Sequence, residues 1–294
     1  MKKFILMCSV LLSAFVMVTS CKDDPVTPST VDVAYFNVAE GSKWIYSNYR
    51  LLPTTDGYSE ELLGENDTLT QGAKKIVLEK NATMMRHRFF NPLLSQASTI
   101  ANYTVYEDEA ENKVFVNSDF MKIFIPEVLQ TYMDIAFDTD KWFLLADGKA
   151  VKEWVLDSFA LTDTDLSLGE ESISLNGHLK FAVKRAKDTT IASANTKAHT
   201  YTMSAFFEGK LNYPSLPFIS SFAVKVEFCK INFYFGSQKG LLGIFSPAND
   251  VVLVTDDPVG KALLATAGFP NGYPIPMPIN VNGFDKRLIN IDVK

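Results

Sequence analysis

The stretch that decides the fold is residues 222–235, Phe-Ala-Val-Lys-Val-Glu-Phe-Cys-Lys-Ile-Asn-Phe-Tyr-Phe, the longest strand-like pattern in the chain. Alternation with a period of two is typical of a β-strand that buries one face. The apolar face consists of Phe222, Val224, Val226 and Phe228, then, after a slip of one residue, Ile231, Phe233 and Phe235. A slip near Cys229-Lys230 indicates a β-bulge, which bends a strand. The stretch therefore predicts a long, curved strand.

Shorter patterns on both sides predict more strands, at 44–49, 74–88, 103–106, 113–117, 142–145, 154–159, 172–187, 199–213, 241–245, 251–255 and 288–293. Residues 54–72, rich in Thr, Asp, Glu and Gly, are predicted to be loops around a short segment at 60–63. The acidic turn at 107–112 is typical of a hairpin tip. The sequence therefore predicts a mainly β fold, an antiparallel and strongly curved sheet or an incomplete barrel or sandwich, with a few short helices.

Three helices are predicted among these strands. Asp257-Pro258 supplies an N-cap and a first-turn proline for a helix at Pro258–Ala267, which Gly268 would end. A second apolar stripe at Asp119–Phe137 predicts a helix in two pieces broken at Ile125, because Pro126 disfavours a helical residue before it. A short helix is expected at 91–97. Prolines at 270, 274, 276 and 278 predict an extended surface segment over Phe269–Ile279.

The amino-terminal end has the organisation of a secretory signal peptide. Lys2 and Lys3 are followed by fifteen mostly apolar residues at 4–18 and by the small residues of Val18-Thr19-Ser20-Cys21. The apolar run is too short for a helix of ~20 residues that spans a membrane. We therefore expect residues 1–20 to be a signal peptide that is removed, 21–33 a flexible tether, and 34–294 one β-rich domain, with a subdivision near 160–170 left open.

The tetrapeptide Val18-Thr19-Ser20-Cys21 resembles the lipobox of bacterial lipoproteins. That resemblance implies that Cys21 carries a diacylglycerol, that cleavage occurs before it, and that the new amino terminus is acylated, for example with palmitate. Lys22-Asp23-Asp24 is similar to the charged tract after the lipidated cysteine in Bacteroidota-type lipoproteins, where it implies transport to the cell surface. The resemblance thus implies a lipid anchor in the outer membrane and a place at the cell surface, with the periplasmic face as the alternative.

Charge and cysteine content limit the classes of partner. Loss of Lys2 and Lys3 with the signal peptide leaves 26 basic and 34 acidic side chains, a formal net charge of −8. An acidic chain is repelled by phosphate backbones, so no nucleic acid is expected as a partner. Cys8 leaves with the signal peptide and Cys21 carries the lipid. Cys229 then has no partner, and we expect no intramolecular disulfide.

The residues with catalytic potential form no recognised motif. His87, His178 and His199 are isolated, without a His-Glu-x-x-His helix or a Gly-x-Ser-x-Gly turn around a serine. The acidic pairs Asp138/Asp140 and Asp163/Asp165 lack the spacing of a calcium loop. We therefore expect a protein that is not an enzyme and that holds no metal or cofactor. A secreted hydrolase stays as the second alternative, because paired carboxylates can come from distant strands.

The leading hypothesis is non-catalytic binding at the outer membrane. A glycan site would use the flat rings of Trp44, Trp142 and Trp154, while a hydrophobic ligand would need an apolar cavity among Phe222, Val224, Phe228 and Phe233. All seven side chains are of types that more often belong to an ordinary core. The first alternative is a structural or assembly lipoprotein that binds an outer-membrane protein, for which the proline-rich segment at 269–279 would be suitable.

Overall fold

The computed structural model describes residues 34–55, 57–90, 99–124, 136–168, 171–248, 251–275 and 283–294. Several sequence predictions fall on other residues. The signal peptide at 1–20, Cys21, the tether to residue 33, the short helix at 91–97 and the second helical piece after Ile125 lie outside the described residues. So does most of the proline-rich run after Ile275.

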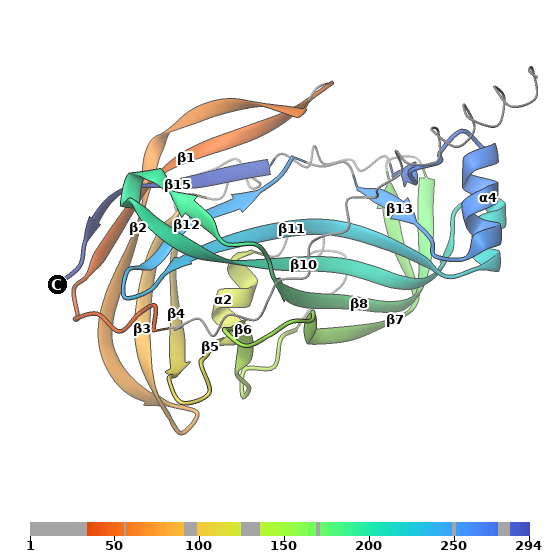
Figure 1. Cartoon of the computed structure of the whole chain (residues 1–294). Coiled ribbons are helices and arrows are strands. Elements are labelled where there is room, and N and C mark those ends of the chain that lie inside the picture. The colour runs from red at the N-terminus through yellow and green to blue at the C-terminus, as the bar shows by residue number, and fades with distance from the viewer. Residues whose placement is uncertain are drawn as a thin grey trace, which may run out of the picture.

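Antiparallel strands dominate the described chain, which confirms the predicted fold class. The strands are β1 (Lys43–Thr54), β2 (Gly57–Val77), β3 (Lys80–Phe89), β4 (Thr99–Asp108), β5 (Lys113–Val116), β6 (Phe143–Asp147), β7 (Trp154–Leu168), β8 (Glu171–Arg185), β9 (Thr189–Ile191), β10 (Thr196–Asn212), β11 (Val224–Gly236), β12 (Gly240–Ser246), β13 (Val252–Val254), β14 (Tyr273–Pro274) and β15 (Gly283–Asp292). The strand order of the main sheet is β6-β5-β4-β3-β2-β1-β15-β12-β11-β10-β8-β7, with β9, β13 and β14 as side branches. Figure 1 shows β1 to β4 at one end of the molecule and the long strands β7, β8, β10 and β11 running toward the other.

The two edge strands of this sheet, β6 and β7, approach each other. The indole Nε1 of Trp154 on β7 donates a hydrogen bond to the backbone oxygen of Leu144 on β6, at 2.7 Å. Lys141, just before β6, forms an ion pair of 3.1 Å with Asp157 on β7. The sheet is therefore nearly closed, as in the incomplete barrel predicted from the sequence, and side chains rather than backbone ladders join its edges here.

The bulge predicted in β11 is present. The register with β10 shifts between the pairs Ala205↔Cys229 and Phe206↔Glu227, so that Phe228 is the extra residue. Before the bulge β11 pairs with β13, and after it β11 pairs with β12. One bent strand therefore belongs to two differently directed parts of the sheet, because a bulge increases the local twist.

The prediction of loops over 54–72 is wrong, because residues 57–77 form the continuous strand β2. Its first ten residues are largely exposed on both faces, so the composition carries no alternating signal. Pairing with β1 from Leu62↔Tyr49 to Gly57↔Thr54 holds these residues extended. Tertiary pairing thus overrides local composition.

Two helices, α2 (Ser118–Ile123) and α4 (Pro258–Thr266), lie in the described part, with short 3₁₀ turns η1 (Ala192–Ala194) and η2 (Pro217–Ser221). The carboxylate of Asp257 accepts a hydrogen bond from the backbone N–H of Gly260 at 2.9 Å, which confirms the predicted N-cap of α4. Helix α2 confirms the first piece of the predicted second helix. Within the described ranges, no helix has both the length and the apolar character needed to cross a membrane.

The aromatic core fills the inner, concave side of the sheet, and the first described residues seal one end of it. The Tyr35 ring stacks on Phe235 with 4.9 Å between ring centroids. One carboxylate oxygen of Glu107 accepts hydrogen bonds from the backbone N–H groups of Tyr35 and Phe36, at 2.8 and 2.9 Å. Burial raises the pKa of Glu107 to about 7. These contacts attach the entry of the domain to the end of β4.

The turn between β11 and β12 completes this end. Gly240 has a φ of +72°, and its N–H donates to the backbone oxygen of Tyr35 at 2.8 Å. The indole of Trp44 lies directly beside it, and its Nε1 donates to the backbone oxygen of Lys239 at 2.5 Å. A left-handed φ and the close approach of an indole both favour glycine at this position.

Candidate functional site

A pocket of about 500 Å³ lies on the outer face of the sheet, opposite the aromatic core. The strands β1, β15, β12 and β11 form its floor. Strand β9 and the turn η1 form the wall that faces this floor. The pocket is lined by Ser47, Tyr49, Thr189, Thr190, Ile191, Ala192, Ser193, Tyr234, Leu242, Gly243, Phe245, Asp285, Lys286, Arg287, Leu288 and Ile289. The volume is within the ~300–1,000 Å³ that small-molecule sites usually have.

Cross-strand register assembles the floor from two neighbouring rows. One row contains Tyr49 of β1, Asp285 of β15 and Phe245 of β12, which are consecutive partners across the sheet. The next row contains Ser47, Arg287, Gly243 and Tyr234 in the same way. Directly opposed residues in antiparallel strands have Cβ atoms about 5 Å apart, so these side chains form one continuous surface.

Gly243 lies in the second of these rows. A Cβ atom at this position would lie 3.0 Å from the backbone oxygen of Lys286 and 3.4 Å from the Tyr234 ring. Glycine therefore allows the backbone of β15 and the Tyr234 ring to lie close to β12 in this row of the floor.

The wall opposite the floor is a short hydroxyl-rich segment. Strand β9 pairs with the beginning of β10, through Thr190↔Lys197 and its neighbours. The ammonium group of Lys239 donates to the backbone oxygen of Ala194 at 3.4 Å and holds the end of η1. Thr189, Thr190 and Ser193 line the pocket from this side. The pocket thus has rings on the floor and hydroxyl groups on the facing wall.

Arg287 is the electrostatic centre of the pocket. Its Nε donates to Asp285 at 2.7 Å, its Nη2 donates to Glu60 at 2.5 Å, and its guanidinium carbon lies 4.2 Å from the centroid of the Tyr49 ring. The hydrogen bond to Glu60 raises the pKa of Arg287, and burial raises the pKa of Asp285. Two carboxylates and one ring therefore hold the guanidinium plane in one orientation.

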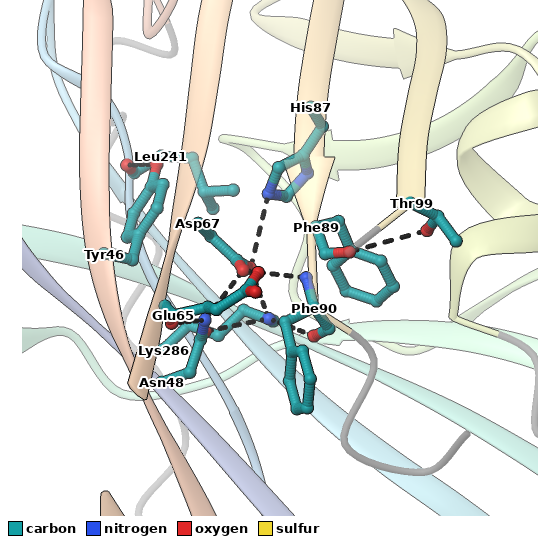
Figure 2. A network of polar contacts seen from close by, with 10 residues as sticks. All are labelled: Tyr46, Asn48, Glu65, Asp67, His87, Phe89, Phe90, Thr99, Leu241 and Lys286. Carbon is teal, nitrogen blue, oxygen red and sulfur yellow. Dashed lines mark hydrogen bonds and ion pairs between the residues drawn. The ribbon is translucent and has the colours of Figure 1, made fainter. Parts of the chain in front are cut away.

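On the same strand, Lys286 points to the inner face, because side chains alternate along β15. Its ammonium group donates to Asn48 Oδ1 at 3.1 Å, to the backbone oxygen of Phe90 at 2.8 Å and to the carboxylate of Asp67 (Figure 2). Asp67 also accepts from Asn48 Nδ2 at 2.7 Å and from the N–H of Phe90 at 2.8 Å. Lys286 and Asp67 are both 1% exposed, so this is a fully buried ion pair whose donors are occupied.

His87 lies beside this network. Its Nε2 is 3.8 Å from Asp67, and neither ring nitrogen has a hydrogen-bond partner among the described residues. Burial lowers the pKa of His87 to about 4, and burial also lowers the pKa of Lys286. The neutral imidazole packs among the rings of Tyr46, Phe89 and Tyr103. It faces the core side, so the outer pocket does not include it.

The three predicted tryptophans lie apart. Trp44 is fully buried in the core, and Trp154 is half-buried where it joins the two edge strands. Trp142 is half-buried beside Tyr106, with 5.9 Å between ring centroids. No ring contact joins any two of them in the part of the chain that the structure describes. A glycan-binding role for these indoles stays a prediction, and none of them lines the outer pocket.

The predicted apolar set is buried in the core. Phe233 packs against Phe120 and Phe124, with ring centroids 5.6 and 5.1 Å apart. Phe222 lies under Gly260 of α4, where an added Cβ would be 2.6 Å from its ring. Val224 and Phe228 belong to the same cluster. Their role as a hydrophobic-ligand site stays a prediction, while their contacts are those of packed core side chains.

Sequence reasoning missed the residues of the outer pocket. Tyr49 and Tyr234 occupy the phase of their strands opposite the buried residues, where a polar side chain is expected. A large ring on the solvent-facing phase is the signal that could have identified them. The three histidines and the acidic pairs do not come together, and no group of metal-ligating side chains is present within the described ranges.

Comparison with known proteins finds similar solved structures. No protein-family model matches the chain, and no curated protein matches it. One similar solved structure is a "putative lipoprotein" of Parabacteroides distasonis, at 12% identity and a TM-score of 0.41. Another is a "putative exported protein with YmcC-like fold" of Bacteroides fragilis, at 8% identity and a TM-score of 0.40. Each alignment covers 88% of this chain and 98% of the other.

Proposed function

We propose that this protein is a cell-envelope lipoprotein that binds a glycan without catalysis, in the pocket between β15, β12 and the β9–η1 segment. The observation that carries the proposal is the lining of that pocket. Tyr234 and Phe245 provide ring surface for sugar C–H groups, while the Tyr49 ring supports Arg287. Asp285, Arg287 and the hydroxyl groups of the opposite wall provide hydrogen-bond partners for sugar hydroxyls.

The position of the pocket on the outer face of the sheet favours a glycan over a hydrophobic ligand. The concave side of the sheet is occupied by stacked and edge-to-face rings such as Tyr35, Phe233 and Phe235. The outer pocket instead combines rings with charged and hydroxyl-bearing side chains, and an acyl chain would displace water from these polar groups without replacing its hydrogen bonds. A ligand that is itself covered with hydroxyl groups satisfies them.

We expect Tyr234→Ala and Phe245→Ala each to weaken glycan binding about tenfold, because each removes a ring from the floor of the pocket. The measurement is a screen of neutral oligosaccharides against the purified protein in a detergent without sugar groups, followed by titration calorimetry on those that bind. The control is Tyr106→Ala, a half-buried tyrosine on β4 that stacks on Phe115 and does not line the pocket. Equal losses in all three variants, or no binding by the unaltered protein, would contradict the proposal.

The envelope location rests on the lipobox at 18–21 and the Lys-Asp-Asp tract after it. We expect Cys21→Ser to abolish incorporation of labelled palmitate in growing cells, because only a thiol accepts the diacylglycerol. The control is Cys229→Ser, which removes the other cysteine of the mature chain and should leave the label in place. External protease added to intact cells should digest the protein if it is displayed at the surface. Retention of palmitate in the Cys21→Ser protein would remove the lipid anchor from the proposal.

A further inference from the structure

We infer that the pocket selects uncharged glycans and rejects those that carry carboxylate or sulfate groups. This inference rests on the proposed function, because it names the ligand class of the same pocket. It depends on the contacts that the basic side chains of the pocket already make within the protein. A basic residue in a sugar site often indicates an acidic sugar, whereas the contacts of Arg287 indicate a neutral one.

Arg287 offers little to an incoming anion. Two of its three nitrogens donate to fixed carboxylates, Nε to Asp285 and Nη2 to Glu60. One face of its guanidinium plane is covered by the Tyr49 ring. An anionic sugar would have to displace a carboxylate or lie within a few ångströms of two of them, and like charges placed together cost free energy.

The second basic residue of the lining, Lys286, does not attract an anionic sugar either. Its ammonium group lies on the inner face, is 1% exposed, and donates to Asp67, Asn48 and Phe90. Asp67 neutralises it there. Its charge therefore stays on the far side of the sheet from the ligand.

The ion pairs at the floor of the pocket thus leave an excess of negative charge around Arg287. Among the described residues, the carboxylates of Glu60 and Asp285 share this one guanidinium group, and the Asp285 side chain is only 15% exposed. A carboxylate in such a position accepts hydrogen bonds from sugar hydroxyls without losing its own cationic partner. The same arrangement is favourable for a neutral, hydroxyl-rich ligand and unfavourable for an acidic one.

The test compares pairs of oligosaccharides that differ only in charge. Acidic oligosaccharides, such as oligogalacturonates, are paired with their carboxyl-reduced or methyl-esterified forms, and sulfated chains are paired with desulfated ones. At low salt, the neutral member of each pair should bind to the unaltered protein at least about tenfold more tightly than the acidic member. This difference in affinity should decrease as salt screens the carboxylates. Equal or tighter binding of the acidic members would overturn the inference while leaving glycan binding intact. Absence of binding by every member would overturn the proposed function as well.

A substitution at Glu60 tests the effect of its charge without changing the size of the side chain. Glu60→Gln keeps the size of the side chain and removes one of the two carboxylates on Arg287. We expect it to raise the ratio of acidic-member to neutral-member affinity about tenfold. The control, Glu111→Gln in the turn between β4 and β5, makes the same change in net charge and should leave the ratio unchanged. An unchanged ratio in Glu60→Gln, or an equal rise in both variants, would count against the selection mechanism.

Discussion

Replacing Lys286 with methionine is expected to lower the free energy of unfolding by about 3–5 kcal/mol, because it leaves the carboxylate of Asp67 buried without its cation. Asp67 is 1% exposed and would keep only the hydrogen bonds from Asn48 and the N–H of Phe90. The backbone oxygen of Phe90 would also lose its donor. Urea denaturation of the full chain, followed by tryptophan fluorescence, measures the loss.

A second variant distinguishes loss of the ion pair from loss of packing. Lys286→Met combined with Asp67→Asn removes both charges and keeps a side-chain oxygen for Asn48 and Phe90. We expect the double variant to be more stable than Lys286→Met alone. The control is Lys225→Met, since Lys225 also lies over an aromatic ring, 3.8 Å from the centroid of Phe206, and should cost about 1 kcal/mol or less. A cost below about 1 kcal/mol for Lys286→Met would show that the buried pair is not needed for stability.

The second large effect is expected at Gly240. An alanine there must adopt a φ near +72°, and its Cβ would lie 2.5 Å from Cζ2 of Trp44. Backbone strain of about 1–2 kcal/mol and overpacking of about 1–3 kcal/mol together predict a loss of about 2–5 kcal/mol. The indole cannot move away easily, because it is fully buried and hydrogen-bonded to Lys239. Thermal or urea unfolding of Gly240→Ala measures the loss.

Gly268 provides the matched control for that substitution. It has a φ of +93°, and within the described residues no atom beyond its chain neighbours lies within 4 Å of the Cβ that an alanine would add. Gly268→Ala should therefore show the backbone strain alone, about 1–2 kcal/mol. If the two alanine variants lose the same stability, the contact with Trp44 contributes nothing and only the dihedral angle matters.

The outer pocket is built from rings that site prediction from the sequence did not name. Trp44 and Trp154 attract attention as large aromatic side chains, yet one fills the core and the other joins the sheet edges. Tyr49, Tyr234 and Arg287 are individually unremarkable on strands that come from different parts of the chain. Their proximity follows from the pairings Ser47↔Arg287 and Tyr234↔Gly243, which no local pattern specifies.

Local sequence patterns were sufficient to predict most of the strands and helix α4. The period-two pattern of residues 222–235 contained both the strand and its bulge, and Asp257-Pro258 contained the start of α4. The prediction was wrong for β2, because its exposed residues do not alternate between apolar and polar. The lipobox and the tract after it are a prediction from the sequence by itself, since they lie outside the described residues.

The sequence by itself predicted most of the strands, though not β2, and the bend in β11, and the envelope location stays a prediction from its first twenty-four residues. Only the tertiary structure decided which strands are neighbours, and with them the pocket and the Lys286–Asp67 pair, whose members are 219 residues apart. The physical reason is that alternation along a strand assigns each side chain to a face, whereas the residue beside it depends on the register with another strand.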